Sequence, residues 1–238
     1  MGTVSQQYDE IWDHVFGDMQ EAGPVHRHMK RMLRRILGTL DYESVVDVGC
    51  GQGHNLPLLT AGRALKRVTG IDVSEKALEK ARLVAGADFD QVDIQQGALP
   101  GKWDLVFSSL VLEHLPDDEA ALRNMRSMAG RYLVVTTIAG DFEKYRPWDE
   151  RLGHVRNYRA GELEAKVQRA GFVVDRVIYW GFPFYSPIAR QLQNRSSAGT
   201  GRFGPTDELA AWLLYWLYYL NSGRRGDLLI LAGRTAQA

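Results

Sequence analysis

The stretch Val45-Val46-Asp47-Val48-Gly49-Cys50-Gly51-Gln52-Gly53 decides the fold of this chain. Residues 44–48 are β-branched and apolar on both faces, which is typical of a strand buried within a parallel sheet. Three glycines follow at alternate positions, and residues 54–65 have helical character. Glycine lets the backbone turn sharply and lets a ligand lie against it. A helix that begins there points free N–H groups at that ligand. The stretch therefore predicts a strand–turn–helix unit that binds a small molecule with an anionic or hydroxyl-rich part.

The spacing of the glycines distinguishes between two classes of ligand. In the dinucleotide-binding fingerprint the third glycine comes three residues after the second. Here His54 occupies that position, and the third glycine, Gly53, comes only two residues after Gly51. This spacing argues against a nicotinamide-dependent oxidoreductase, which stays the alternative enzyme class.

Acidic residues follow the next two strand-like segments. Asp72 comes directly after the run 67–71, and Asp93 lies at the tip of a short third strand, 88–92. A carboxylate at the end of the second strand can accept hydrogen bonds from both hydroxyls of a ribose. The two positions therefore indicate a nucleoside held at the carboxyl edge of a sheet.

Four segments taken in order resemble the class I S-adenosylmethionine-dependent methyltransferases. They are the turn 45–53, Gly70-Ile71-Asp72-Val73-Ser74, Val92-Asp93-Ile94 and the run 103–115, Trp-Asp-Leu-Val-Phe-Ser-Ser-Leu-Val-Leu-Glu-His-Leu. The resemblance covers roughly residues 40–180 and specifies the cofactor but not the methyl acceptor. It implies an α/β fold, with a Rossmann-like, doubly wound sheet of seven strands that is mostly parallel and ends in an antiparallel strand.

The resemblance also implies how the chain holds S-adenosylmethionine, with S-adenosylhomocysteine as the product. Backbone groups of the three glycines border the amino-acid end of the donor, Asp72 takes the ribose hydroxyls, and Asp93 with the Ile94 backbone meets the adenine amino group. Asp47 either meets the donor's amino group or holds the turn through backbone hydrogen bonds. The expected cofactor-binding residues are Tyr8, Asp47, Gly49, Cys50, Gly51, Gly53, Asp72, Val73, Asp93, Ile94 and Ser108.

Methyl transfer from a sulfonium needs alignment of the acceptor, exclusion of water and a group that takes a proton from the acceptor. Histidine suits the last task near neutral pH. His114 lies just past the strand 104–107, and His154 lies in the polar segment 140–157, which is expected to be an irregular loop after the strand 132–138. Each histidine could equally be a hydrogen-bonded loop residue. The candidate catalytic or acceptor-orienting residues are His154, His114, Tyr158 and Arg156.

Composition narrows the partners of this 238-residue chain. Lys and Arg number 29, as do Asp and Glu, so the net charge is zero and a nucleic-acid partner is not expected. The DNA-methylating branches of the family carry an Asn/Asp-Pro-Pro-aromatic tetrad where this chain has Ser108-Ser109-Leu110-Val111.

No metal-ligand spacing is present in the sequence, so no metal is expected. The single cysteine, Cys50, fits a reducing cytoplasm, and the longest apolar run, 209–220, is too short for a membrane span.

The chain is expected to form one domain, 1–238. It comprises N-terminal helices over 3–40, the cofactor-binding core 41–180, an aromatic helical insertion over 181–225 and the last strand 226–234. The insertion departs from the minimal family pattern and includes a helix over 206–220 that is rich in tryptophan and tyrosine. Three alternatives stay open for this helix: it packs on the core, it forms a homodimer interface, or it lines an acceptor pocket.

The sequence thus predicts transfer of a methyl group from S-adenosylmethionine to an oxygen or nitrogen of a small molecule. Secondary metabolism is one setting for such an activity. The non-enzymatic alternative is a module that binds S-adenosylmethionine without catalysis and dimerises through the aromatic helix.

Overall fold

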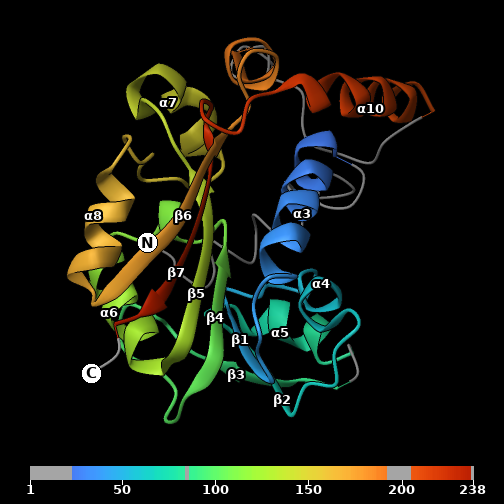
Figure 1. The fold of residues 1–238 in the computed structure, drawn as a ribbon. Coiled ribbons are helices and arrows are strands. Elements are labelled where there is room, and N and C mark those ends of the chain that lie inside the picture. The colour runs from blue at the N-terminus through green and yellow to red at the C-terminus, as the bar shows by residue number, and fades with distance from the viewer. Residues whose placement is uncertain (1–22, 84–85, 192–204, 237–238) are drawn as a thin grey trace.

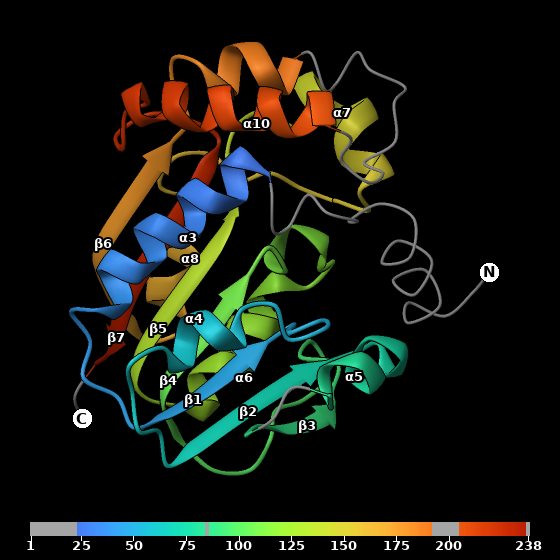
Figure 2. The same ribbon diagram turned by 90° about the vertical axis from the view of Figure 1, so that its right-hand side faces the viewer.

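The computed structural model describes residues 23–83, 86–191 and 205–236. These residues form one seven-stranded sheet with helices on both of its faces (Figures 1 and 2). The strand order is β3-β2-β1-β4-β5-β7-β6. The strands are β1 (Ser44–Val48), β2 (Arg67–Asp72), β3 (Asp88–Gln91), β4 (Trp103–Ser109), β5 (Ala129–Ile138), β6 (Phe172–Trp180) and β7 (Leu228–Thr235).

The helices alternate with the strands in the first two thirds of the chain and then cluster before the last strand. The α-helices are α3 (Pro24–Leu37), α4 (Leu56–Thr60), α5 (Glu75–Ala81), α6 (Asp118–Met128), α7 (Phe142–Arg151), α8 (Glu162–Arg169) and α10 (Pro205–Leu217). Three short turns complete the set: η1 (Leu112–His114), η2 (Tyr185–Ala189) and η3 (Tyr218–Leu220).

The sheet is parallel except for β7, which runs antiparallel to both β5 and β6. The order of the strands reverses between β1 and β4, because β2 and β3 extend the sheet on one side of β1 and β4 extends it on the other. Ligands of such sheets bind outside the carboxyl ends of the strands at the point of reversal. The glycine turn after β1 lies at that point, and the predicted fold class is confirmed.

The two faces of the sheet are covered by different helices (Figure 1). One hydrophobic cluster joins α3 and α4 to the face that carries Val45, Leu105 and Phe107. A second cluster joins α6 and α8 to the opposite face, which carries Val46 and Val106. Successive residues of β1 and β4 therefore enter opposite cores, which is why β1 is apolar on both faces.

Local signals determine where several helices begin. The Ser74 side chain accepts a hydrogen bond from the Ala77 N–H and caps α5, and Asp117 caps α6 through the Ala120 N–H. Pro57 lies in the first turn of α4, where its missing N–H costs nothing. The α4 helix covers only residues 56–60 of the helical segment predicted over 54–65.

The prediction of an irregular loop over 140–157 is wrong for its central part, which forms α7. Asp141 caps this helix by accepting a hydrogen bond from the Glu143 N–H, and Arg146 pairs with Glu143 and Glu150 along its surface. Pro147 lies inside the helix, where its ring removes one helical hydrogen bond. The buried side chains of Tyr145 and Asp149 anchor α7 to the rest of the chain.

The expected insertion before the last strand is helical and includes α10. This helix packs against α3, where its residue Tyr215 stacks near His28 and accepts a hydrogen bond from it through the backbone carbonyl. Tyr218, just past α10, is buried against Trp180 of β6. One face of α10 thus packs on the body of the protein, as the first of the three alternatives predicts. Part of the predicted first helix, with Tyr8, lies outside the described residues.

Candidate active site

The glycine turn after β1 has a conformation that requires glycine. Gly49, Gly51 and Gly53 all have positive φ, at 72°, 52° and 82°, a region that other L-residues rarely adopt. A Cβ at Gly49 would also come within 2.3 Å of a methyl group of Val111, which follows β4. The turn is therefore packed tightly against the segment that continues from β4 toward η1.

The turn is tied to the end of β2 by backbone and side-chain hydrogen bonds. The N–H groups of Gly49 and Cys50 both donate to the Ile71 carbonyl, at 2.7 and 3.0 Å. The Asp72 carboxylate accepts hydrogen bonds from the Gly51 N–H at 2.8 Å and the Ser74 N–H at 2.9 Å. Asp72 thus links the glycine turn to the start of α5, and it lies where the sequence predicts a ribose-binding carboxylate.

Asp47 is a fully buried carboxyl group, and neither of its oxygens has a hydrogen-bond partner among the described residues. Burial, followed by the nearby charge of Asp72, raises the pKa of Asp47 to about 8. Buried polar groups in folded proteins are nearly always paired, so an unpaired carboxyl group requires an explanation. The predicted role in holding the turn by accepting backbone hydrogen bonds is not seen, and a cationic ligand group would complete the pairing.

The other predicted cofactor residues lie in the turn itself or near the carboxyl ends of β2, β3 and β4. Cys50 is buried, and burial raises the pKa of its thiol far above the usual value, so it stays protonated. Val73 follows β2, and its carbonyl accepts a hydrogen bond from Gln91. Asp93 accepts a hydrogen bond from the Gln95 N–H, beside the buried Ile94. The Ser108 hydroxyl is fully buried and donates to the Val48 carbonyl, so it joins β4 to β1.

His114 and His154 come together although forty residues separate them. Their rings meet edge to face with centroids 4.7 Å apart, and each side chain is at least nine-tenths buried. The His114 Nδ1 lies 3.1 Å from the Gly153 carbonyl oxygen. Burial, followed by the neighbouring His154, lowers the pKa of His114 to about 3, so this ring is neutral at physiological pH.

The histidine pair adjoins the glycine turn. Val111, which packs against Gly49, accepts a hydrogen bond on its carbonyl from the His114 N–H at 2.9 Å. A single turn of η1 therefore separates the wall of the glycine turn from the imidazole of His114. Two of the four predicted catalytic residues thus lie together, and His114 follows Val111 by three residues.

Asp149 of α7 positions His154. The His154 Nδ1 lies 3.4 Å from Asp149 Oδ1, and the His154 N–H donates to the Asp149 carbonyl at 2.9 Å. Burial opposes ionisation of Asp149, but contacts with His154 and Arg190 outweigh it and keep the pKa of this carboxyl below its usual value. A carboxylate beside one ring nitrogen favours a proton there and leaves the other nitrogen able to accept one.

Tyr158 and Arg156 both bind Asp118, and this contact accounts for their position. The Tyr158 hydroxyl is buried and donates to Asp118 at 2.7 Å, and the Arg156 guanidinium pairs with Asp118 at 2.8 Å. Burial and the Asp118 carboxylate raise the pKa of Tyr158 well above its usual value. These two residues hold the segment after α7 against α6, whereas the sequence predicts that they orient an acceptor.

Three side chains at the edge of this site have the chemistry of metal ligands. Glu113, His114 and His154 each offer a ligand atom, and these atoms lie within 4.8 Å of one another. The Glu113 carboxylate is fully buried, accepts a hydrogen bond from the Thr137 hydroxyl at 2.8 Å and has its pKa raised by burial. Sequence spacing does not reveal this cluster, because His154 reaches it only through the fold.

Several residues of the site escape sequence reasoning. Glu113, Asp149 and Val111 contribute through contacts between distant segments, and no local pattern marks them. Leu110 has a φ of 58°, unusual for a residue other than glycine, and its N–H donates to the Thr136 carbonyl. The left-handed conformation at Leu110 ends β4 and starts the turn that carries Val111 to the glycines.

Comparison with known families decides the assignment. A family model described as "Methyltransferase domain" matches residues 19–177, which is more than half of the chain. The chain belongs to this methyltransferase family. The assignment confirms the resemblance stated above and removes the nicotinamide-dependent alternative.

Curated relatives of this methyltransferase act on small molecules according to their names. The ubiquinone biosynthesis O-methyltransferase of Bordetella parapertussis is 33% identical over 117 residues, which are 44% of this chain and 47% of that protein. The trans-aconitate 2-methyltransferase of Azoarcus sp. is 28% identical over 159 residues, which are 64% of this chain and 59% of that protein. The methyltransferase thus matches about half to two thirds of the length of such relatives.

Solved structures share the fold of the methyltransferase. The N-methyltransferase NodS of Bradyrhizobium japonicum, in complex with S-adenosyl-L-homocysteine, has a TM-score of 0.63 and 19% identity. The match covers 97% of this chain and 98% of that one. In the part of the methyltransferase that the structure describes, no helix is long and apolar enough to cross a membrane.

The residues of the methyltransferase fit a sulfonium nucleoside with an amino-acid end. The unpartnered carboxyl group of Asp47 lies behind the glycine turn, where the donor's ammonium group would pair with it. The glycines of the turn bring no side chains of their own between the backbone and a ligand. Asp72 presents a carboxylate at the end of the neighbouring strand, within 2.8 Å of the turn.

Proposed function

We propose that this methyltransferase transfers a methyl group from S-adenosylmethionine to an oxygen or nitrogen of a small molecule. The observation that carries the proposal is the juxtaposition of the buried histidine pair with the glycine turn through Val111. The turn provides a place for the donor, and the histidines provide a place for the acceptor's proton. The names of the curated relatives support a small-molecule acceptor.

The proposed donor cradle uses the residues around the turn. Asp47 pairs with the amino group of the donor, backbone groups of the glycines border its amino-acid end, and Asp72 binds the ribose hydroxyls. Asp93 and the Ile94 backbone contact the adenine amino group, and Val73, Cys50 and Ser108 line the site. When bound, the donor supplies an electrophilic methyl group on a positively charged sulfur.

His154 is the proposed general base, oriented by Asp149. Its ring accepts the proton that an acceptor hydroxyl or amino group loses as its oxygen or nitrogen bonds the methyl carbon, while the bond from that carbon to sulfur breaks and S-adenosylhomocysteine leaves. His114 packs edge to face against His154 and stays neutral, because a pKa of about 3 leaves it unprotonated at pH 7. The neutral neighbour excludes water from one side of His154 and adds no positive charge there.

The experiment compares donor binding with turnover. Isothermal titration with S-adenosylhomocysteine measures the cradle, and methyl transfer to a panel of phenols, carboxylic acids and amines measures the reaction. Asp72→Ala should weaken binding about tenfold or more, because hydrogen bonds to a charged carboxylate are worth roughly 1.5–3 kcal/mol. The exposed Asp88→Ala is the matched control. Unchanged affinity in the Asp72 variant would contradict the ribose role, and lack of transfer to every acceptor class would contradict the catalytic proposal.

A reducing cytoplasm remains the proposed location, because it suits a chain with one cysteine that is buried as a free thiol.

A further inference from the structure

A groove on the α3 side of the sheet has three arginines around an apolar floor. It encloses about 390 Å³ between α3, the edge strand β6 and the turn after α10. This volume lies within the usual range for small-molecule sites. The lining residues are Arg31, Met32, Arg35, Ile36, Arg176, Ile178, Trp180, Tyr219, Asn221 and Gly223.

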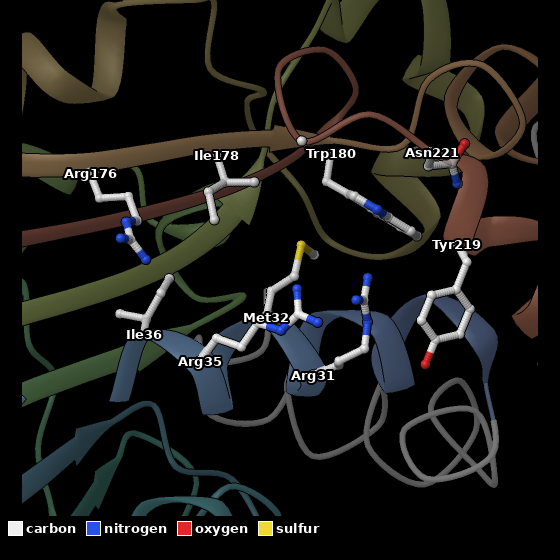
Figure 3. A pocket seen from close by; sticks show the side chains of 10 residues that line it. Arg31, Met32, Arg35, Ile36, Arg176, Ile178, Trp180, Tyr219 and Asn221 are labelled. Atoms are coloured by element: carbon white, nitrogen blue, oxygen red, sulfur yellow. The ribbon is translucent and has the colours of Figure 1, made fainter. Parts of the chain in front are cut away.

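The periodicities of the two elements explain why these side chains meet. Arg176, Ile178 and Trp180 are alternate residues of β6, so they share the face that α3 covers. Arg31 and Arg35 are four residues apart on α3 and so lie one above the other on one side of the helix. Figure 3 shows both arginines rising from α3 toward the strand, while Arg176 comes down from β6 toward the helix.

No ion pair joins any of the three guanidinium groups to a carboxylate in the described part of the chain, whereas Arg131, Arg190 and Arg234 are each paired. Asp175, next to Arg176 on β6, pairs with Arg234 instead. Arg31 stacks on the Tyr219 ring at 4.5 Å, and its Nε is buried without a hydrogen-bond partner. The groove therefore gathers positive charge that no carboxylate of the described residues neutralises.

The floor beneath these charges is apolar. Met32 and Ile36 are buried, and Trp180 is 2% exposed. Guanidinium groups match the geometry of phosphates and carboxylates through paired hydrogen bonds. Such a site suits a ligand that has both an anionic end and an apolar body.

We propose that this groove binds an anionic amphiphile, a molecule whose phosphate or carboxylate group contacts the arginines and whose apolar body lies on Met32, Ile36, Ile178 and Trp180. The site is separate from the proposed methyl-transfer site. Four strand spacings separate β6 from β1 in the sheet, or about 19 Å. A group held by the arginines is thus not the one methylated, because reacting atoms must approach to about 3–3.5 Å.

Two sources of this chemistry are distinguished by the choice of probe. Octyl phosphate represents a soluble ligand. Inorganic phosphate tests its anionic group alone, and octanol tests its apolar chain alone. Vesicles of phosphatidylcholine with and without phosphatidylglycerol represent a membrane lipid. We expect titration calorimetry to show saturable binding of octyl phosphate that weakens with added salt, and at least tenfold weaker binding of inorganic phosphate and of octanol.

The variants Arg35→Gln and Arg176→Gln should each weaken octyl phosphate binding about tenfold. Arg34→Gln is the matched control, because Arg34 is an exposed arginine adjacent to Arg35 on α3 that does not line the groove. Unchanged S-adenosylhomocysteine affinity in all three variants will show that they are folded. That readout is independent of the groove, so a failure of the donor site and a failure of the groove are distinguishable.

Three results would overturn the proposal: no saturable binding of octyl phosphate, equal loss in the Arg34 and Arg35 variants, or equal binding of octanol. Sedimentation with phosphatidylglycerol vesicles that is lost in the Arg35 and Arg176 variants would support the groove and identify a lipid as its source. Octyl phosphate binding without vesicle binding would support the groove and identify a soluble ligand.

Discussion

At the scale of single residues, Asp47 is notable because the described part of the fold gives its carboxyl group no hydrogen-bond partner. It is fully buried, and its oxygens have no partners among the described residues. Natural proteins retain such groups at functional sites, where a ligand completes the pairing. The cost of burying this carboxyl group is therefore expected to appear in the pH dependence of both stability and donor binding.

The first prediction concerns Asp47→Asn. The pKa of Asp47 is about 8 in the folded protein and 3.8 in an unperturbed chain. The folded state therefore holds a proton that the unfolded state releases, and stability is lost as pH rises toward 8. Between pH 6 and 8 the wild type should lose about 1.4 kcal/mol per pH unit relative to the Asn variant. Chemical denaturation at several pH values measures the difference.

The same group should govern donor binding. The donor's ammonium group favours the ionised form of Asp47, so affinity for S-adenosylhomocysteine should rise with pH from 6 to 7.5, approaching tenfold per unit. The Asn variant should bind weakly and with little pH dependence. The exposed Asp88→Asn serves as the control and should follow the wild type. Parallel pH profiles for the wild type and the Asp47 variant would remove Asp47 from the cradle.

The second prediction separates the base from a metal ligand. His154→Ala should lower turnover by about 10²–10⁴-fold, the usual contribution of a general base, and leave donor affinity intact. Turnover of the wild type should persist after dialysis against a chelator. If the chelator abolishes turnover and a divalent cation restores it, the cluster of Glu113, His114 and His154 holds a metal and the general-base assignment fails.

At the scale of elements, α7 depends on a buried ionic network. Arg190 pairs with Asp149 at 2.9 Å and with Asp227 at 3.0 Å, and it donates to the Ala139 carbonyl at 3.2 Å. The Arg190 side chain is 3% exposed. It therefore joins α7 to the ends of β5 and β7, and it also holds the carboxylate that positions His154.

The third prediction tests this network. Arg190→Met should destabilise the protein by about 3–5 kcal/mol, because it leaves the buried carboxylate of Asp149 and the half-buried one of Asp227 without their cation. Arg146→Met on the same helix is the control. Arg146 is exposed and pairs with Glu150 at the surface, so its loss should destabilise the protein far less than the loss of Arg190. Urea denaturation of both variants provides the comparison, and equal losses would show that α7 does not depend on the buried pair.

At the scale of the whole molecule, α10 leaves an apolar face uncovered by the described residues. Trp212 and Trp216 are 52% and 56% exposed, and Leu220 at the end of the helix is 68% exposed. Their neighbours Tyr215 and Tyr218 face α3 and β6. An exposed apolar face of this kind is a candidate interaction surface, and two of the sequence-based alternatives for α10 are left to be tested.

The fourth prediction distinguishes a dimer interface from an acceptor pocket. If α10 forms a homodimer interface, Trp212→Ser with Trp216→Ser should give a monomer by light scattering and leave methylation in place. The exposed Leu83→Ser, a residue 86% exposed and distant from α10 in sequence, is the control. Survival of the oligomer together with loss of acceptor binding would instead assign α10 to the acceptor pocket.

The sheet could be predicted from the sequence because its strands are marked by local residue patterns. The segment Ser44–Val48 forms a strand with the predicted bounds, since β-branched residues that are buried on both faces leave a local pattern. The capping roles of Ser74 and Asp117 likewise follow from short-range hydrogen bonds. The α7 helix was missed because its polar surface and Pro147 resemble a loop, whereas its stability comes from Asp149 and Tyr145 buried against distant segments.

By itself, the sequence determined the β1 turn, the carboxylate after β2 and the family, because these depend on residues a few positions apart. Only the tertiary structure decided that His114 and His154 meet, that Asp47 lacks a partner and that three arginines share a groove. Such contacts join segments tens of residues apart, and their geometry follows from how helices and strands pack, which no local pattern encodes.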